Sequence, residues 1–361
     1  MKDKKVIINI LLIALIISIF TGCKSFDNDK PKVNIFNTTE AMDVAKSYLE
    51  NISKGELTKA NDLCIEELLN DNKVISTGTS KIVAYNVDQL IETSNSVYVV
   101  FNVLRSSNSE PKCDLDSFAI NVGKIKEDYK ITEVKAVNKQ QIFVKDNGLR
   151  VIEDGGGDSK LIVNLSSMPK DVYPRENEVM LYKEPTPRDA FGTISLSYTG
   201  QKIAISTVKK DDVFISIGYL DESTPVQGSA EGQNSNEAGA SEELQNLLEK
   251  PIAKKVVSVD ILKDVKIQNF IFSQEEDDLI VEYAEKSGVK RIKLYKTEDG
   301  TLVKSGIDEM FPSNKYNVVL DGLDKNAIYI NVSQVEGRKD IDNSILGTYK
   351  LDLESLEISK K

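Results

Sequence analysis

The stretch GTISLSYTGQKIAISTVKKDDVFISIGYLDES, residues 192–223, sets the pattern for much of the chain. Runs rich in Ile, Val, Phe and Thr alternate with the turn-forming clusters TGQ and KKDD. β-Branched and aromatic runs bounded by turn residues are typical of strands. We therefore expect three antiparallel strands here, joined by tight turns.

The same shape recurs along the second half of the chain, in residues 149–166, 269–300 and 315–355. The second strand of each unit is marked by Leu161, Ile203, Leu279 and Ala327, in steps of 42, 76 and 48 residues. The longest step contains the polar segment 222–251 and shortens to 46 residues without it. Steps of this size match the period of a β-propeller blade.

Residues 197–206, SYTGQKIAIS, resemble the strand-turn-strand signature of TolB-type propeller blades. That family usually has Ser-Pro-Asp-Gly where this chain has Ser197-Tyr198-Thr199-Gly200. The resemblance implies a propeller-like all-β domain over 148–361, made of repeated meanders. Four blades, an open curved meander and a sandwich all remain open. Because residues 223–250 are rich in Gly, Ser, Asn and Glu, we expect a disordered insert between blades, with a short helix at Glu242–Glu249.

Residues 39–145 predict a different unit, an α+β domain. Apolar residues recur at helical spacing through Ala41, Tyr48 and Ile52, and again from Leu57 to Leu68. Four β-rich runs follow, at 81–90, 96–105, 115–125 and 129–137. Two or three helices on one face of a curved antiparallel sheet are the expected arrangement.

This order, with the phrase YLENISKGELTKANDL at 48–63, resembles the nuclear transport factor 2-like superfamily. The resemblance implies a cone-shaped sheet with a pocket. Enzymes of that superfamily commonly use His with Asp, and this chain has no His. We therefore expect the nearby acids Asp43, Glu66 and Glu67 to lie on solvated helix faces rather than to act in catalysis.

The N-terminal sequence predicts where the protein is located in the cell. Lys2, Lys4 and Lys5 precede fifteen mostly apolar residues, Val6 to Phe20, which as a helix would span about 22 Å, short of a membrane core of about 30 Å. The ending Phe20-Thr21-Gly22-Cys23 resembles the lipobox of bacterial lipoproteins. It implies a signal peptide over 1–22, lipid attachment (palmitate among the acyl chains) at Cys23 and a tether over 23–38. The expected location is the extracellular face of the cell membrane, and the Lys-, Asn- and Ile-rich composition hints at a Gram-positive host.

Composition excludes several classes of function. The net charge of −11 argues against a nucleic-acid partner. Without His, neither Ser-His-Asp nor Cys-His catalysis is available. We expect Cys64 and Cys113 to be buried thiols rather than a disulfide.

Two kinds of motif resemble ligand-binding sites, but their sequences are better explained as turns. Residues 153–160, EDGGGDSK, lack the Gly-Lys-Ser/Thr helix start of a phosphate loop and predict a hairpin turn. The acid clusters at 211–212, 275–278 and 340–342 lack the spacing of a calcium loop.

No catalytic, cofactor or metal residues are predicted, so Cys23 is the one assigned site. The leading hypothesis is a lipid-anchored, non-enzymatic envelope protein that binds a protein, peptide or glycan partner. A carboxylate-dependent hydrolase of envelope polymers is the first alternative, since glycosidases need only Asp and Glu. A solute-binding lipoprotein is the second.

Overall fold

The computed structural model describes residues 36–70, 80–107, 109–173, 182–220 and 249–361. The chain divides into two compact units, residues 1–37 and 38–361. The predicted signal peptide, Cys23, nearly all of the tether and residues 223–248 of the predicted insert lie outside the described residues. Within the described ranges, no helix is both long and apolar enough to cross a membrane.

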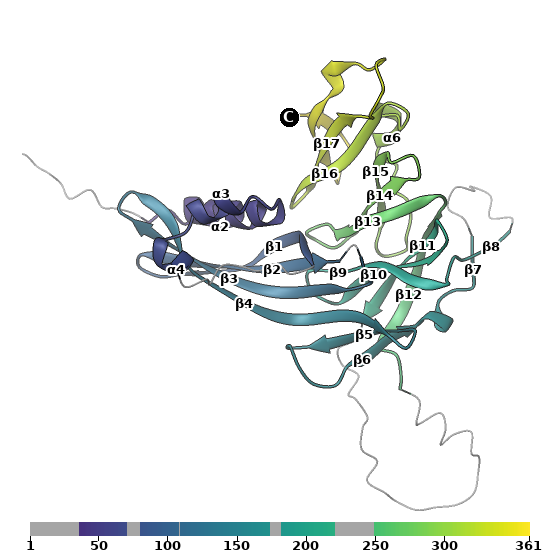
Figure 1. Ribbon diagram of the computed structural model, residues 1–361, viewed down its shortest axis with the longest axis horizontal. Coiled ribbons are helices and arrows are strands. Elements are labelled where there is room, and N and C mark those ends of the chain that lie inside the picture. Colours follow the sequence, from purple (N-terminus) through teal and green to yellow (C-terminus); the bar gives the residue numbers. More distant parts are fainter. Residues whose placement is uncertain (1–35, 71–79, 108, 174–181, 221–248) are drawn as a thin grey trace, which may run out of the picture. The chain divides into compact units, whose positions relative to one another are not determined.

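Three helices open the second unit: α2 (Thr38–Ser53), α3 (Leu57–Asp62) and α4 (Glu66–Asn70) (Figure 1). The buried side of α2 is the predicted apolar stripe, made of Ala41, Ala45, Tyr48, Leu49 and Ile52. After α2 the chain turns through Gly55, whose φ of 75° suits a residue without a Cβ. The first predicted helix is therefore confirmed.

The second predicted helix is wrong as one element, because it is interrupted between α3 and α4. There the backbone pairs with a strand instead: Ile131 N–H donates to Leu63 O (2.8 Å), and Ile65 N–H donates to Ile131 O (3.0 Å). These bonds bury Cys64 against the sheet, and they leave Leu57, at the start of the predicted stripe, 57% exposed. A tertiary backbone contact has overridden the helical periodicity.

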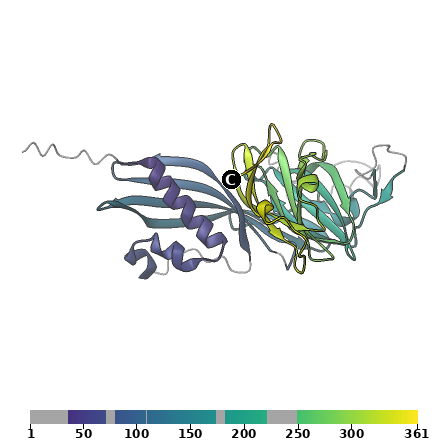
Figure 2. The ribbon, with the colours of Figure 1, turned by 90° about the horizontal axis from the view of Figure 1, so that it is seen from above.

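The helices cover a six-stranded antiparallel sheet whose strands lie in chain order. They are β1 (Lys81–Glu92), β2 (Ser96–Ser106), β3 (Cys113–Ile125), β4 (Asp128–Lys145), β5 (Gly148–Glu153) and β6 (Lys160–Asn164). Helix α2 crosses the first four strands (Figure 2). It packs on side chains such as Val99, Phe101 and Ile120, which are fully buried.

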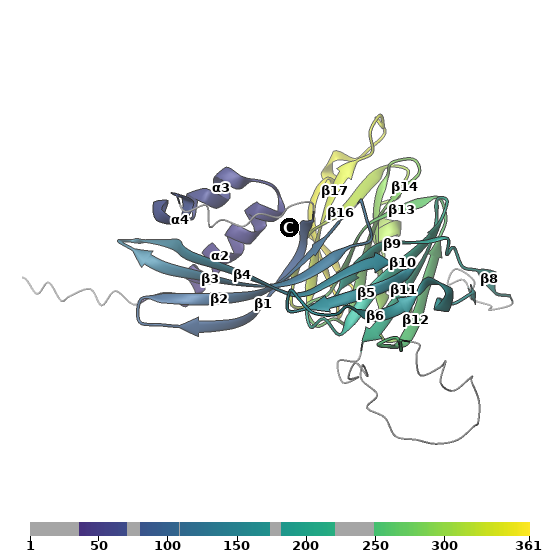
Figure 3. The same cartoon turned by 60° about the horizontal axis from the view of Figure 1, so that its bottom comes forward.

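The predicted domain boundary at 145–148 falls inside this sheet. β4 continues well past the predicted end at residue 137, because Ile142 and Val144 keep the alternation of a strand. Asp146 and Asn147, both with positive φ, then form a two-residue turn into β5. One sheet therefore runs from the helices into the β-rich part of the unit (Figure 3).

Three further antiparallel sheets follow. The first joins β9 (Ala190–Leu196), β10 (Lys202–Lys209), β11 (Asp212–Leu220) and β12 (Ala253–Leu262). The second joins β13 (Val265–Phe272), β14 (Asp278–Glu285) and β15 (Lys290–Lys296). The third joins β16 (Tyr316–Asp324), β17 (Ala327–Gln334), β18 (Gly347–Asp352) and β19 (Ile358–Lys360). Strands β10, β14 and β17 contain the predicted markers Ile203, Leu279 and Ala327, and each is the second strand of its sheet.

Smaller elements complete the unit: β7 (Asp171–Val172) paired with β8 (Glu184–Pro185), the short helix α6 (Ile307–Met310), and 3-10 turns at Leu165–Ser167 and Asn343–Ile345. The chain is thus predominantly β, as predicted. The cone-shaped arrangement implied for the N-terminal helices and strands stays a prediction.

The predicted insert does not join two blades. Strands β11 and β12, which flank it, are hydrogen-bonded neighbours from Val213–Leu262 to Leu220–Ala253. The segment between them therefore connects two strands of one sheet. Sequence spacing alone could not reveal this, since an insertion lengthens the repeat equally wherever it occurs within it.

A repeated turn links successive sheets. Gly200 N–H donates to Ser197 O, and 76 residues later Glu276 N–H donates to Ser273 O, with both turn residues at positive φ. Gly200 lies against Gln140 of β4, whereas the Glu276 carboxylate accepts from the N–H of Thr199 (2.7 Å) and from the Thr199 hydroxyl (3.0 Å). Each turn therefore contacts the sheet before it.

We predict that Gly200→Ala destabilises the fold more than Gly155→Ala. Both glycines have positive φ (73° and 68°), which costs an Ala about 1–2 kcal/mol. At Gly200, however, a Cβ would lie 2.5 Å from Oε1 of the buried Gln140, while at Gly155 no atom lies within 4 Å. Denaturant unfolding should show a loss larger by about 1 kcal/mol for Gly200→Ala, and Gln140→Ala should remove the difference. Equal losses would contradict the packing described.

Candidate functional site

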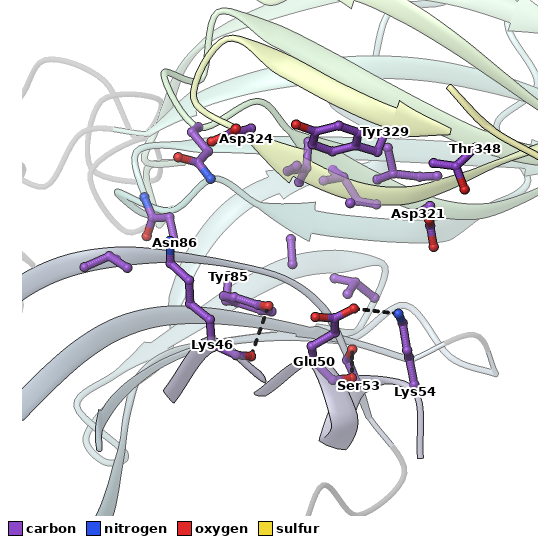
Figure 4. Close-up of a pocket in the computed structure, with 18 of the residues that line it drawn as sticks. Lys46, Glu50, Ser53, Lys54, Tyr85, Asn86, Asp321, Asp324, Tyr329 and Thr348 are labelled. Carbon is purple, nitrogen blue, oxygen red and sulfur yellow. Dashed lines mark hydrogen bonds and ion pairs between the residues drawn. The ribbon is translucent and has the colours of Figure 1, made fainter. Parts of the chain in front are cut away.

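A groove of about 630 Å³ lies between α2, β1, β13 and β16 (Figure 4). One wall is largely polar and comes from α2 and the residue that follows it, through Met42, Lys46, Glu50, Ser53 and Lys54. The opposite wall is mixed: Ile271, Leu320, Leu323 and Tyr329 supply apolar surface, and polar side chains lie between them, namely Gln274, Glu282, Asp321, Asp324, Thr348 and Lys361. The groove thus brings together side chains that are up to 319 residues apart in the chain, from Met42 to Lys361.

Two strand edges border this groove. Residues 83–87 of β1 and 320–324 of β16 line it consecutively, so it meets the strands along their edges rather than on one face. Each of these strands is hydrogen-bonded to one neighbour, β1 to β2 and β16 to β17. An edge strand presents unpaired N–H and C=O groups, which can pair with another chain.

The two edges are protected to different degrees. In β16, the ladder is irregular between Leu320 and Gly322, and Leu320 N–H already donates to Glu282 Oε1 (2.9 Å). In β1, the irregularities lie at Ile82/Ala84 and Val87/Gln89, which leaves Ala84–Val87 regular between them. The β1 edge is therefore the better template for an added strand.

Charges on α2 shape one end of the groove. Lys54 Nζ lies 2.6 Å from Glu50 Oε1, and this hydrogen bond raises the pKa of Lys54, helped by the charges of Glu50, Asp321 and Glu56. Asp321 belongs to β16, so the Lys54 ammonium interacts with both sides of the groove. At this end of the groove, the positive charge of Lys54 is therefore balanced by Glu50 and Asp321.

Tyrosines add neutral donors to the site. Burial raises the pKa of Tyr85 to about 12, and the charge of Glu50 adds to the effect, so the phenol stays protonated at neutral pH. Its hydroxyl donates to Lys46 O (3.4 Å), which ties β1 to α2. On the opposite wall, the ammonium of Lys361 lies over the ring of Tyr329, 4.4 Å from the ring centroid.

A second polar cluster lies outside the groove, on the α2 side of the same sheet. Asp114 and Asp116 are only 2% and 3% exposed. Asp116 accepts from Arg105 Nε (2.5 Å) and Asn138 Nδ2 (2.8 Å), and Asp114 accepts from Gln141 Nε2 (2.9 Å). Every carboxylate here has donors of its own, so the cluster is best explained as a buried ion-pair network.

We predict that Arg105→Met destabilises the chain by about 3 kcal/mol, because it leaves two buried carboxylates without their cation. Lys135→Met is the matched control, since it removes an exposed partner of Glu133 in the same sheet and should cost less than about 1 kcal/mol. Denaturant unfolding measures both. Asp114→Asn with Asp116→Asn should recover much of the loss in the Arg105 variant, and similar losses for Arg105→Met and Lys135→Met would argue against the network.

The residues considered in the sequence are spread over the structure and are not brought together. Asp43, Glu66 and Glu67 are exposed on the helices, as predicted. The acidic turns hold ion pairs between turns, such as Asp211–Lys286 (2.9 Å), and residues 153–160 form the predicted hairpin turn between β5 and β6. Across the described residues, no group of three or more His, Cys, Asp or Glu side chains is placed to hold a metal ion.

The cysteine prediction is confirmed: Cys64 and Cys113 are free and buried. Burial raises the pKa of the Cys64 thiol to about 11 and raises that of Cys113 as well. Neither thiol is therefore a nucleophile at neutral pH.

The groove could not be located from the sequence. Its residues look ordinary one by one: lysines and an acid on a helix, a Tyr-Asn pair in a strand, an acid at a bulge. The available signal was that β1 and β16 each begin a sheet, which makes them candidates for edge strands.

Comparisons with known proteins give a fold likeness only. No family model and no curated protein matches the chain. Among solved structures, the β-propeller domain of the trilobed protease from Pyrococcus furiosus is 10% identical, with a TM-score of 0.28 over 76% of this chain and 57% of that one. A putative TolB from Agrobacterium tumefaciens is 6% identical, with a TM-score of 0.29 over 77% and 80% of the two chains. An oligogalacturonate lyase in complex with manganese is 11% identical, with a TM-score of 0.29 over 79% and 74%.

The expectation that the chain is not an enzyme is corrected by these comparisons, because a lyase and part of a protease are among the similar structures. At these TM-scores, the likenesses assign no activity to this chain. The chain spans just over half of the protease propeller chain that it matches.

Proposed function

We propose that the chain binds an extended peptide, which adds as a strand to the β1 edge in the groove. The observation that carries this proposal is the regular, singly paired stretch Ala84–Val87 lining a groove of about 630 Å³. Main-chain hydrogen bonds to an exposed sheet edge supply affinity in strand addition, and alternate side chains supply specificity.

The walls of the groove suit a strand with two different faces. Residues of an added strand would point alternately to the two sides. One set would meet the polar side chains of α2, and the other would meet the apolar side chains of Ile271, Leu320 and Leu323 on the opposite, mixed wall. The preferred peptide is therefore amphipathic, with polar and apolar residues alternating.

We also propose that this binding unit is held at the outer face of the cell membrane by lipid on Cys23. The lipobox-like ending at Phe20–Cys23 and the basic, short apolar leader support the proposal. An envelope protein segment is then the expected source of the peptide.

Peptide binding is tested by selecting displayed random peptides of about ten residues, longer than a typical strand of about six, on the full chain in detergent. A selected peptide is then synthesised with single backbone N-methyl groups. We expect every second N-methyl group to weaken binding about tenfold or more, because alternate N–H groups of an added strand face its neighbour. Uniform tolerance of N-methylation, or the failure to select any peptide, would refute strand addition.

A variant of the protein locates the binding site. Gly322 of β16 lines the groove, and a Cβ there would meet only Tyr329 Cδ2 at 3.7 Å, so Gly322→Leu should fold and fill the groove. Gly156→Leu is the matched control, because its surroundings are open and lie outside the groove. We expect at least a tenfold loss of affinity for Gly322→Leu and no change for Gly156→Leu, with thermal unfolding as the check on folding. Equal affinities would place the site elsewhere.

Lipid attachment is tested by counting thiols in the chain isolated from membranes. Because Cys64 and Cys113 are buried with raised pKa values, the folded chain should not react with dithionitrobenzoate. The unfolded chain should show two reactive thiols when Cys23 is modified and three when it is free. Three thiols would contradict the proposal.

A further inference from the structure

We infer that the bound peptide presents a carboxylate to Lys46 of α2. This inference rests on the proposed function, and it names the chemistry that selects one peptide over another. It depends on the contrast between two of the three lysines that line the groove, Lys46 and Lys54, which are eight residues apart on the chain. The third, Lys361, lies over the ring of Tyr329 on the other wall.

Lys54 is already neutralised. Its ammonium lies 2.6 Å from Glu50 Oε1, and Asp321 acts on it from across the groove. A peptide carboxylate at this end would face two acids as well as the lysine. This end of the groove therefore gains little from an acidic ligand.

Lys46 is in a different situation. Its backbone carbonyl accepts from Tyr85, but among the described residues its ammonium has no ion pair or hydrogen bond. Figure 4 shows the side chain extending from α2 along the groove toward Asn86. A half-buried cation in a groove is stabilised by an anionic partner, more strongly there than on an open surface.

Asn86, at the same end of the groove, has an acceptor atom without a hydrogen-bond donor among the described residues. Its Oδ1 is buried and has no hydrogen-bond partner in the described part of the chain. An unpartnered buried acceptor is unfavourable, so a donor from a ligand would be stabilising. A strand added beside β1 brings main-chain N–H donors to this position, while its side chain or terminus brings the carboxylate to Lys46.

Two acids of β16, Asp321 and Asp324, also line the groove and would repel an acidic peptide. Asp321 acts on Lys54, and Asp324 Oδ1 accepts from Lys325 N–H (2.9 Å). Both side chains are exposed, so water and salt screen them. The nearest unmatched charge for the polar face of the peptide is therefore Lys46.

The test uses the selected synthetic peptide with each Asp or Glu changed to its amide, on the full chain and on two variants. We expect one position at which the acid binds about tenfold better than the amide. Lys46→Gln should abolish this preference, whereas the matched Lys54→Gln should keep it. A second arm amidates the C-terminus of the peptide. A preference lost on amidation alone identifies the terminal carboxylate as the group bound by Lys46.

Each outcome decides the matter. Strand addition without any acid preference, or with a preference that depends on Lys54 instead, overturns this inference and leaves the proposed function standing. Failure to obtain any peptide with the alternating N-methyl pattern overturns both. An acid preference that depends on Lys46 alone supports both.

Discussion

The length of the first four strands is the constraint on which the rest of the unit depends. β4 runs for 18 residues, and its neighbour β3 for 13, so one sheet serves two packing partners along its length. The burial pattern of β2 shows where the sheet passes from one packing partner to the other. From Val97 to Phe101 only alternate residues are buried, on the side of α2, but Phe101 to Leu104 are all buried. At Leu104 the opposite face enters a core shared with Ile194 and Leu196 of β9. The sheet therefore gains a second buried face midway.

This change in burial explains both polar features of the sheet. Past the end of α2, the α2 side no longer has an apolar cover, and Arg105, Asp114 and Asp116 occupy it as a paired network. At the edge strand β1, the change occurs between Ala84, which belongs to the shared core, and Tyr85, which is bonded to α2. The groove lies at this point because α2 flanks the β1 edge on one side and β16–β17 on the other, and neither pairs with it.

The strands could be predicted from sequence because their cause is local. Alternating apolar residues and turn clusters such as Thr199-Gly200-Gln201 fix a strand and its hairpin within a few positions. Three of the four markers, Ile203, Leu279 and Ala327, fell in second strands for the same reason, whereas Leu161 fell in β6, the sixth strand of the first sheet. The split of the second helix and the location of the insert could not be predicted, because each depends on a partner distant in sequence: Ile131 for Leu63 and Ile65, and β12 for β11. The groove is harder still, since being an edge strand is a property of the whole sheet, and nothing in the sequence of 83–87 differs from that of a paired strand.

The edge of β1 is open, whereas the edge of β16 is protected against pairing with another chain. Unprotected edges promote aggregation, and proteins usually block them with bulges, charges or covering elements. β16 has a bulge at Asp321 and a carboxylate from Glu282 on its Leu320 N–H. β1 has its irregularities only at the two ends of Ala84–Val87, and α2 covers the side of the edge rather than its hydrogen-bonding groups. A protein that had no use for this edge could close it with one inward-pointing charge. Lys46 is close enough to serve, yet it extends along the wall without an acidic partner among the described residues. An edge left regular beside an unmatched cation is the arrangement expected of a site that another chain completes.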